Sequence, residues 1–414
     1  MQRGARDNRL MPIHRHFSLA LVLGLLSAIG PFAIDMYLPA LPDIGRSLRA
    51  DVGTVQLSLT AFFISLGLGQ LLYGPVSDMV GRKPPLYFGL GLFTLASVGC
   101  ALATDIQMLI ALRFLQGLGA AAGGVIPRAI VRDLHTGTEA ARLMSLLMLV
   151  FSVSPILAPL TGSVVIAITG WRGVFWVVAL AAVAGMLMLR GAVAETRSEG
   201  LRMGSSLGGA LRSYGLLLRD AHYLGLVFIG AATMSGFFVY LAGSAFVMIN
   251  HYGLTPTQYS LAFSLNSVAF IGAAQFTSPL GRRIGLPRLV KFATTASGLL
   301  MATLLSFYLL GGDRLVVLIV LFFVSSAFMG LVVPTTSVLA LDAHGAIAGT
   351  ASALMGTLQM LCGAVAMGVV GLFANGEPLP MVAGMATCAL TSMTLAWITL
   401  GGQPRPGPAP EVVR

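Results

Sequence analysis

The sequence predicts an all-α membrane protein with twelve transmembrane helices in two pseudo-symmetric six-helix bundles. Three observations support this fold class: the composition, a series of long apolar stretches and an internal repeat. Of the 414 residues, 56% are hydrophobic and 10% are charged. Soluble globular proteins have about 25% charged residues. The composition therefore excludes a soluble globular protein.

The apolar stretches define the individual spans. A helix needs about 20 apolar residues to cross the hydrocarbon core of a bilayer. The first stretch is too long for a signal-peptide core of about 7–15 residues, so it is a retained span. Twelve stretches meet the length requirement: 17–41, 54–77, 84–103, 106–127, 143–169, 172–194, 222–249, 257–279, 288–310, 314–341, 346–374 and 379–400.

A polar interruption divides these spans six and six. Residues 195–220 are rich in Gly, Ser and charged side chains, a composition typical of a linker. The sequence thus predicts an N-terminal bundle over 1–194, a cytoplasmic linker over 195–220 and a C-terminal bundle over 221–414. The halves also match each other at offsets of 204 to 209, which indicates a duplication: Pro75 with Pro279, Gly81 with Gly285, Pro127 with Pro334 and Asp133 with Asp342. In parallel repeats of this kind, the substrate site lies near the bilayer midplane between the halves.

The distribution of basic residues predicts the orientation. With the N-terminus in the cytoplasm, 20 of the 25 Arg and Lys residues fall in cytoplasmic segments and four fall outside. Such an excess is the positive-inside pattern. It places both termini and the linker in the cytoplasm, and it indicates a lipid bilayer as the partner. Because the basic residues are spread over loops, we expect no nucleic-acid binding.

Two opposite charges lie inside apolar stretches, Asp35 in the first and Arg113 in the fourth. Ionisable residues within a membrane are costly and mark substrate or ion pathways. Each lies about seven residues from the outer end of its span, or about 10 Å deep at 1.5 Å per residue. They are therefore able to pair or to share a water network. Proton coupling and a static structural ion pair both remain open interpretations.

The short connection after the second span carries a motif, Gly74-Pro75-Val76-Ser77-Asp78-Met79-Val80-Gly81-Arg82-Lys83. Glycines permit a tight turn, and Asp78 faces Arg82 at i, i+4 where the segment is helical. The string resembles the signature loop of the major facilitator superfamily, G-x-x-x-D-x-x-G-R-R/K. That resemblance implies the major facilitator fold and assigns a gating role to the matching positions: Gly74, Asp78, Gly81, Arg82 and Lys83.

Further stretches narrow the resemblance. Residues 34–42 and 348–354 are similar to the Bcr/CflA group of drug–proton antiporters, and the likeness runs from about Ser18 to Leu400. The stretch 113–117 resembles the R-x-x-Q-G motif that this family associates with proton coupling, which implies that role for Arg113 and Asp35. The stretch 154–163 resembles the antiporter motif G-P-x-x-G-G, but Ala158 and Ser163 replace two glycines. Pro159 and Gly162 match the motif and are assigned to gating.

Several polar and aromatic residues within the spans are candidates for the substrate cavity. For each of them, helix packing or lipid exposure is the alternative. No Walker-type phosphate loop occurs, and the three cysteines have neither metal-ligand nor disulfide spacing, so we expect no metal and no cofactor. The substrate-binding candidates are Asp35, Tyr37, Gln116, Phe151, Phe237, Tyr240, Asn266 and Gln359.

The resemblance implies a function. We expect a monomeric protein of the bacterial cytoplasmic membrane that is not an enzyme. It is expected to export small amphipathic drugs, of the bicyclomycin or chloramphenicol type, by alternating access driven by the proton gradient. One alternative is a dedicated exporter of a metabolite or amino acid on the same scaffold. Another is a membrane sensor without transport, although the spans leave no room for a sizeable soluble output domain.

Overall fold

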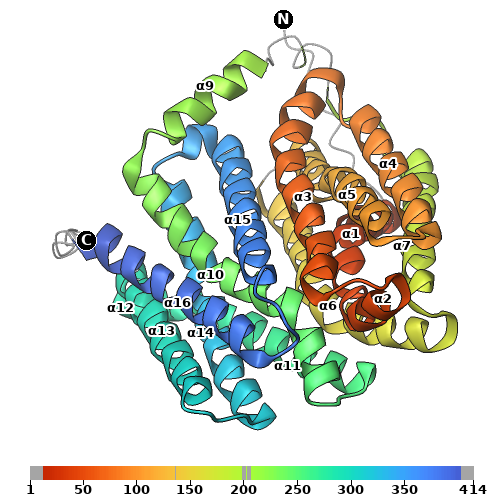
Figure 1. The fold of residues 1–414 in the computed structure, drawn as a ribbon. Coiled ribbons are helices and arrows are strands. Elements are labelled where there is room, and N and C mark those ends of the chain that lie inside the picture. Colours follow the sequence, from red (N-terminus) through yellow and green to blue (C-terminus); the bar gives the residue numbers. More distant parts are fainter. Residues whose placement is uncertain (1–12, 136, 198–201, 203–206, 402–414) are drawn as a thin grey trace, which may run out of the picture.

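The computed structural model describes residues 13–135, 137–197, 202 and 207–401, and every regular element in this part of the chain is helical (Figure 1). The N-terminal half consists of α1 (Ile13–Asp35), η1 (Leu38–Ala40), α2 (Leu41–Leu48), α3 (Val52–Val80), α4 (Lys83–Leu102), α5 (Ile106–Leu134), α6 (Gly137–Thr169) and α7 (Trp171–Ala192). Helix α9 (Leu207–Leu217) lies within the expected linker. The C-terminal half consists of α10 (Ala221–Ala245), η2 (Phe246–His251), α11 (Pro256–Ala274), α12 (Thr277–Ile284), α13 (Leu286–Leu309), α14 (Leu315–Asp342), η3 (Gly345–Ile347), α15 (Ala348–Gly371) and α16 (Pro378–Gly401).

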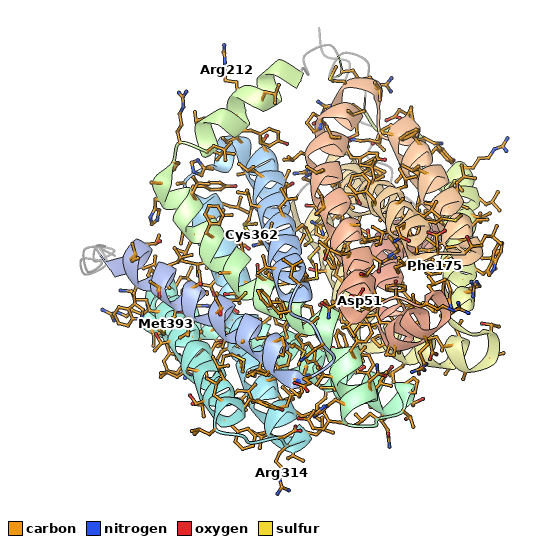
Figure 2. The ribbon with its side chains drawn as sticks, viewed as in Figure 1. Asp51, Phe175, Arg212, Arg314, Cys362 and Met393 are labelled. Carbon is orange, nitrogen blue, oxygen red and sulfur yellow. The ribbon has the colours of Figure 1, made fainter. Side chains whose placement is uncertain are left out.

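The two ends of the molecule are distinguished by their connections. We call the end with the α3–α4 connection and α9 the linker end, and the end with the α2–α3 connection the opposite end. Figure 2 shows Arg212 of α9 at the linker end and Arg314, just before α14, at the opposite end. At the opposite end, Asp51 caps α3 by accepting a hydrogen bond from the backbone N–H of Thr54 at 2.9 Å.

Eleven helices in the described residues are long and apolar enough to cross a membrane. The eighth expected span is also a helix, α11, but it is more polar than the others. Its serines and Asn266 are buried, and two of the serines bond to the other half of the molecule. The hydroxyl of Ser260 donates to the carbonyl of Pro159 at 2.9 Å, and that of Ser264 donates to the carbonyl of Ile156 at 2.9 Å. The twelve-span fold is thus confirmed, with one span whose polarity reflects its place between the halves.

Two helix pairs provide most of the contact between the halves, α6 with α11 and α3 with α15. Helices α3 and α15 run side by side in Figure 1. Midway along them, the Thr357 hydroxyl donates to the carbonyl of Gly67 at 2.9 Å. Nearer the opposite end, Gly53 lies so close to Gly371 that a β-carbon on Gly53 would be 2.3 Å from its carbonyl oxygen. The halves are therefore in direct backbone contact at the opposite end.

The first span is not continuous, contrary to the expected helix over 17–41. Helix α1 ends at Asp35, and the short elements η1 and α2 follow it. Pro39 and Pro42 lack the backbone N–H that a continuing α-helix needs. The break therefore leaves Asp35 in the last turn of α1.

The connection after the second span is shorter than expected. Helix α3 continues to Val80 and α4 begins at Lys83, so only two residues link them. Gly81 has a φ of +102°, a conformation that favours glycine. Gly74 lies inside α3 with open space where a β-carbon would stand. Gly74 therefore lies outside the turn, which Gly81 makes, and its gating role stays a prediction.

Candidate functional site

Arg113 is enclosed within the N-terminal half. Its side chain on α5 is fully buried, with the guanidinium carbon 4.5 Å from the ring centre of Tyr37 and 4.3 Å from that of Phe62. These distances are within the range of cation–π attraction. Nη1 donates to the side-chain oxygen of Gln116 at 2.6 Å and to the carbonyl of Ala33 at 3.1 Å. Nε and Nη2 have no hydrogen-bond partner among the described residues, so the buried cation keeps unused donor capacity there.

Asp35 and Arg113 do not form the static ion pair that the sequence left open as one of two interpretations. No ion pair within 4 Å joins these two described residues. Arg113 instead binds the Ala33 carbonyl, two residues earlier on α1. Asp35 is 5% exposed, and the short helix η1 that follows it contacts α11 of the other half. The two charges are therefore separate groups: Arg113 lies inside one half, and Asp35 is near the boundary with the other.

Helix α6 contacts both sides of this boundary through its two motif residues. A β-carbon on Gly162 would lie 2.4 Å from the carbonyl oxygen of Met36, so α6 packs directly on the break in α1. One turn earlier, Pro159 offers its carbonyl to the Ser260 hydroxyl of α11. Small residues allow this close helix approach. A movement of α6 would be transmitted both to the break beside Asp35 and to the C-terminal half.

Neutral polar and aromatic side chains fill the corresponding region of the C-terminal half. The fully buried hydroxyl of Tyr240 accepts a hydrogen bond from the Asn266 amide at 2.8 Å. Phe237 lies 6.1 Å from the ring centre of Phe263 and 6.3 Å from that of Phe270. In the part of the chain that the structure describes, the side-chain oxygen of Asn266 and the side-chain nitrogen of Gln359 are buried without a hydrogen-bond partner. A bound polar molecule would be able to satisfy these groups.

The expected substrate-binding residues have different partners. Tyr37 and Gln116 contact Arg113, and the Tyr37 hydroxyl bonds to Ser58 at 2.8 Å while the Gln116 amide donates to Ser97 at 2.7 Å. Phe151 on α6 is instead paired with Arg128, whose guanidinium is 4.9 Å from its ring centre. The contacts of Tyr37 and Gln116 show that they position Arg113. Their role in substrate binding remains a prediction.

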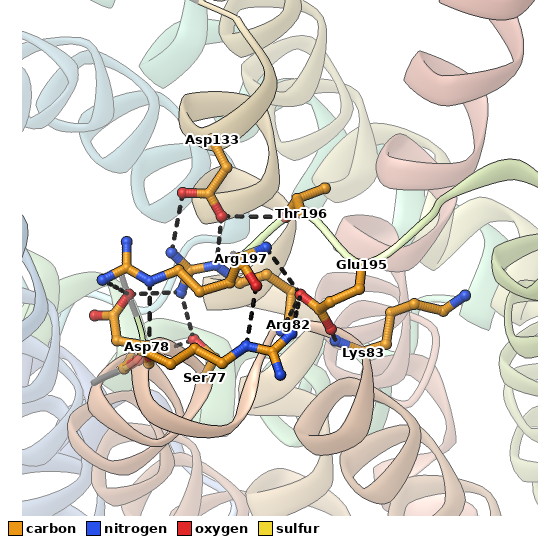
Figure 3. Close-up of polar contacts among 10 residues, drawn as sticks. Ser77, Asp78, Arg82, Lys83, Asp133, Glu195, Thr196 and Arg197 are labelled. Atoms are coloured by element: carbon orange, nitrogen blue, oxygen red, sulfur yellow. Dashed lines mark hydrogen bonds and ion pairs between the residues drawn. The ribbon is translucent and has the colours of Figure 1, made fainter. Parts of the chain in front are cut away.

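A charged network ties together the linker end of the N-terminal half (Figure 3). Arg82 is 4% exposed and lies at its centre. Its Nη1 is 2.8 Å from the Asp78 carboxylate, which confirms the expected i, i+4 pair. Its Nε and Nη2 donate to the two Asp133 oxygens at 2.7 and 3.1 Å, a bidentate geometry that is strong for a charge pair. The carboxylates hold the pKa of Arg82 above its usual value, although burial alone would lower it.

Glu195, the first residue of the expected linker, docks onto the same turn. Its carboxylate accepts hydrogen bonds from the backbone N–H groups of Arg82 at 2.8 Å and Lys83 at 3.0 Å. A third bond comes from the N–H of Arg197 at 3.0 Å. Burial alone would raise the pKa of Glu195, but these hydrogen bonds lower it below its usual value. A β-carbon on Gly81 would lie 2.7 Å from a Glu195 oxygen, so the turn requires glycine for both its φ angle and this contact.

The network includes residues outside the sequence-predicted gating set. Asp133 is identified in the sequence only as half of a repeat match, and neither Glu195 nor Arg197 belongs to a motif. The match of Asp133 to Asp342 is the one sequence signal for its importance. Lys83 takes part through its side chain as well, since Nζ donates to the Val193 carbonyl at 2.8 Å. Among the described residues, the network bonds α3, α4, α5 and the start of the linker to one another.

Metal chemistry has no visible basis in the described part of the chain. No group of three or more His, Cys, Asp or Glu residues there is arranged to hold a metal ion. The three cysteines are free thiols.

Comparisons with known proteins identify the family. The chain matches the Major Facilitator Superfamily over residues 23–367. It is 37% identical over 357 residues to an uncharacterized MFS-type transporter, YdgK, of Bacillus subtilis, covering 86% of this chain and 89% of that protein. It is 29% identical over 378 residues to a bicyclomycin resistance protein homolog of Haemophilus influenzae, covering 91% and 94% of the two chains.

The comparison of structures gives the same fold. A crystal structure of a D-xylose–proton symporter superposes with a TM-score of 0.72 at 15% identity, covering 92% of this chain and 97% of that one. Combined with the helix arrangement and the loop motif around Asp78, these matches confirm the resemblance to the Bcr/CflA group. The chain belongs to the Major Facilitator Superfamily.

Proposed function

We propose that this transporter exports small amphipathic drugs across the bacterial cytoplasmic membrane in exchange for protons. The family supports transport, and the relative named for bicyclomycin resistance supports a drug as the cargo. The observation that supports proton coupling is the position of Asp35. It is a buried carboxyl with no ion-pair partner among the described residues, at a helix break that contacts the other half. Such a group is suited to bind and release a proton as its surroundings change.

The proposed cycle has two steps. With the cavity open to the outside, Asp35 takes up a proton and the drug leaves. With the cavity open to the cytoplasm, the proton leaves and a new drug molecule enters. Gly162 packs against Met36, next to Asp35, and Pro159 binds α11. Helix α6 therefore links the state of Asp35 to the relative position of the halves.

The proposed orientation places both termini and the linker in the cytoplasm. It rests on the excess of Arg and Lys in the segments of the linker end. In this orientation, the contacts of Ser260 and Ser264 with α6 lie in the outer halves of their helices. The outer side of the α6–α11 interface is then the closed side. The Arg82 network holds the cytoplasmic ends of the N-terminal half as one unit during the transition.

Drug accumulation in cells without their own efflux pumps tests this function. Expression should raise resistance to one or more amphipathic drugs and lower their steady-state accumulation. A protonophore should restore accumulation to the level of control cells. Lowered accumulation that persists after the proton gradient has collapsed would contradict proton coupling. Unchanged resistance across a broad panel, with normal protein levels in the membrane, would favour a dedicated metabolite exporter.

A further inference from the structure

A groove of about 510 Å³ lies on the lateral periphery of the C-terminal half, between α13 and α16. Both helices lie on the side of this half away from the N-terminal half (Figure 1). Phe292, Leu299 and Trp397 line the groove, and each is more than half exposed. Because α13 and α16 are membrane spans, this exposed apolar wall faces lipid.

Two cations lie at the linker end of the groove. Arg288 and Lys291 are in the first two turns of α13, and neither forms an ion pair in the described part of the chain. The sequences of α12, α13 and α16 contain no Asp or Glu. Lys291 Nζ is 5.2 Å from the Trp397 ring centre, and the Trp397 N–H donates to the Thr295 hydroxyl at 3.0 Å. The linker end of the groove is thus positively charged. Trp397, which contacts Lys291 there, is of a residue type that is enriched at membrane interfaces.

The apolar part of the groove continues from these cations along α13. Phe292, Ala296 and Leu299 are spaced i, i+4 and i+7, so they lie on one face of the helix. From Arg288 to Leu299 the helix rises about 16 Å at 1.5 Å per residue. A ligand that fits this arrangement has an anionic group at one end and a long apolar chain. A soluble anion would leave the apolar wall unused, and a zwitterionic lipid would leave the two positive charges uncompensated.

We propose that this groove binds an anionic diacyl phospholipid, with its phosphate between Arg288 and Lys291 and one acyl chain along Phe292, Ala296 and Leu299. Basic pockets between membrane helices are known to suit anionic headgroups. The other half lacks this arrangement, because the repeat offset of 204 places Pro84 and Tyr87 where Arg288 and Lys291 lie. The inference depends on membrane insertion and is independent of the transport cycle.

Native mass spectrometry of the purified protein, titrated with dioleoyl phosphatidylglycerol, tests the site. Arg288→Gln with Lys291→Gln removes both cations, and Arg282→Gln with Arg283→Gln removes the same charge from α12 outside the groove. We expect the first pair to weaken binding about 30-fold, given the typical contribution of a basic residue to anionic lipid binding. The control pair should change it less than about threefold. Equal weakening of lipid binding by both pairs of substitutions would overturn the proposal, because it would indicate general electrostatic attraction and not binding at the groove.

A second variant tests the acyl chain separately from the charge. Ala296→Trp fills the middle of the groove and keeps both cations, and it should also weaken phosphatidylglycerol binding at least about tenfold through steric exclusion. Dioleoyl phosphatidylcholine should bind the wild type weakly. Undiminished phosphatidylglycerol binding by Ala296→Trp, or full competition by inorganic phosphate, would reduce the groove to a phosphate site and contradict the proposal. Equal binding of phosphatidylcholine would also contradict it.

Discussion

The linker ends of the two halves share a backbone design but differ in their charges. Gly81 and Gly285 both have a positive φ, and each follows a proline-containing helical segment. In the N-terminal half, Arg82 is buried between two carboxylates. In the C-terminal half, Arg282 occupies the register of Asp78 and its side chain bonds to Ser278 at 3.1 Å. The duplication has kept the turn, while the charge network exists in one half.

The same contrast extends into the membrane. The N-terminal half contains the buried charges, Asp35 and Arg113, whereas the matching region of the C-terminal half contains the neutral pair Tyr240 and Asn266. The difference indicates that the two halves have different roles. Charge-dependent coupling belongs to the N-terminal half, and the C-terminal half supplies a neutral polar and aromatic surface. Variants in the two halves test this difference.

The largest effect is expected for Arg113→Met, which replaces the buried cation by an apolar side chain of similar length. Gradient-driven transport should fall more than about tenfold. The melting temperature should change little, because a buried cation with unused donors contributes little net stability. Transport in membrane vesicles checks the predicted loss of transport, and thermal melting in detergent checks the predicted melting temperature. Retained transport with a strongly lowered melting temperature would assign Arg113 a purely structural role.

The next largest effect is expected for Arg82→Gln, and Arg282→Gln is the comparison variant in the C-terminal half. Loss of the Arg82 guanidinium leaves the Asp133 carboxylate without its bidentate partner. Breaking such a pair is expected to cost about 2 kcal/mol and to slow transport while substrate binding survives. Arg282→Gln should change neither property measurably, since exposed sites contribute little. Equal loss of transport in the two variants would show that the halves share the gating role.

A smaller effect is expected when glycine is replaced by alanine in the two turns. Both substitutions place a β-carbon on a residue with positive φ, which costs about 1–2 kcal/mol. Gly81→Ala also displaces Glu195, whereas a β-carbon on Gly285 meets nothing within 4 Å. We therefore expect Gly81→Ala to lower the melting temperature more than Gly285→Ala. The reverse order would contradict the docking of Glu195 on this turn.

The smallest effect concerns the pH dependence of linker docking. The pKa of Glu195 is lowered from 4.5 in the folded protein, so its ionised form stabilises the fold above about pH 4.5. This contribution is lost as the pH falls through the lowered pKa. The stabilities of wild type and Glu195→Gln should differ by about 1 kcal/mol at pH 7 and converge once the pH falls below the lowered pKa. A difference that is constant from pH 3 to pH 7 would argue against an ionised Glu195.

The sequence predicts the fold and the Asp78–Arg82 pair well because both depend on local spacing. Apolar length defines the spans, and an i, i+4 interval brings side chains together on a helix. The pairing of Asp35 with Arg113 is less predictable. Their sequence positions fix their depth in the membrane but not the direction in which each helix faces. The structure turns Arg113 toward Ala33 and Gln116 instead.

Two other features have no sequence signal of their own. Glu195 binds backbone N–H groups of a turn 112–113 residues away, and backbone donors leave no pattern of residue types. The break after Asp35 depends on prolines that many membrane helices contain without breaking. In both cases, tertiary contacts decide what the local sequence leaves open.

The most direct test of the account replaces Asp35 by Asn, which mimics a permanently protonated carboxyl group. Inverted membrane vesicles are incubated with a radiolabelled drug that the pump-deficient cells identify as a substrate, and its uptake is measured. Asp51→Asn removes a carboxylate from the cap of α3 and serves as the control. We predict that Asp35→Asn loses accumulation driven by a pH gradient but keeps exchange of drug down its own gradient, while Asp51→Asn keeps both. Gradient-driven accumulation by Asp35→Asn at the wild-type level would contradict the account.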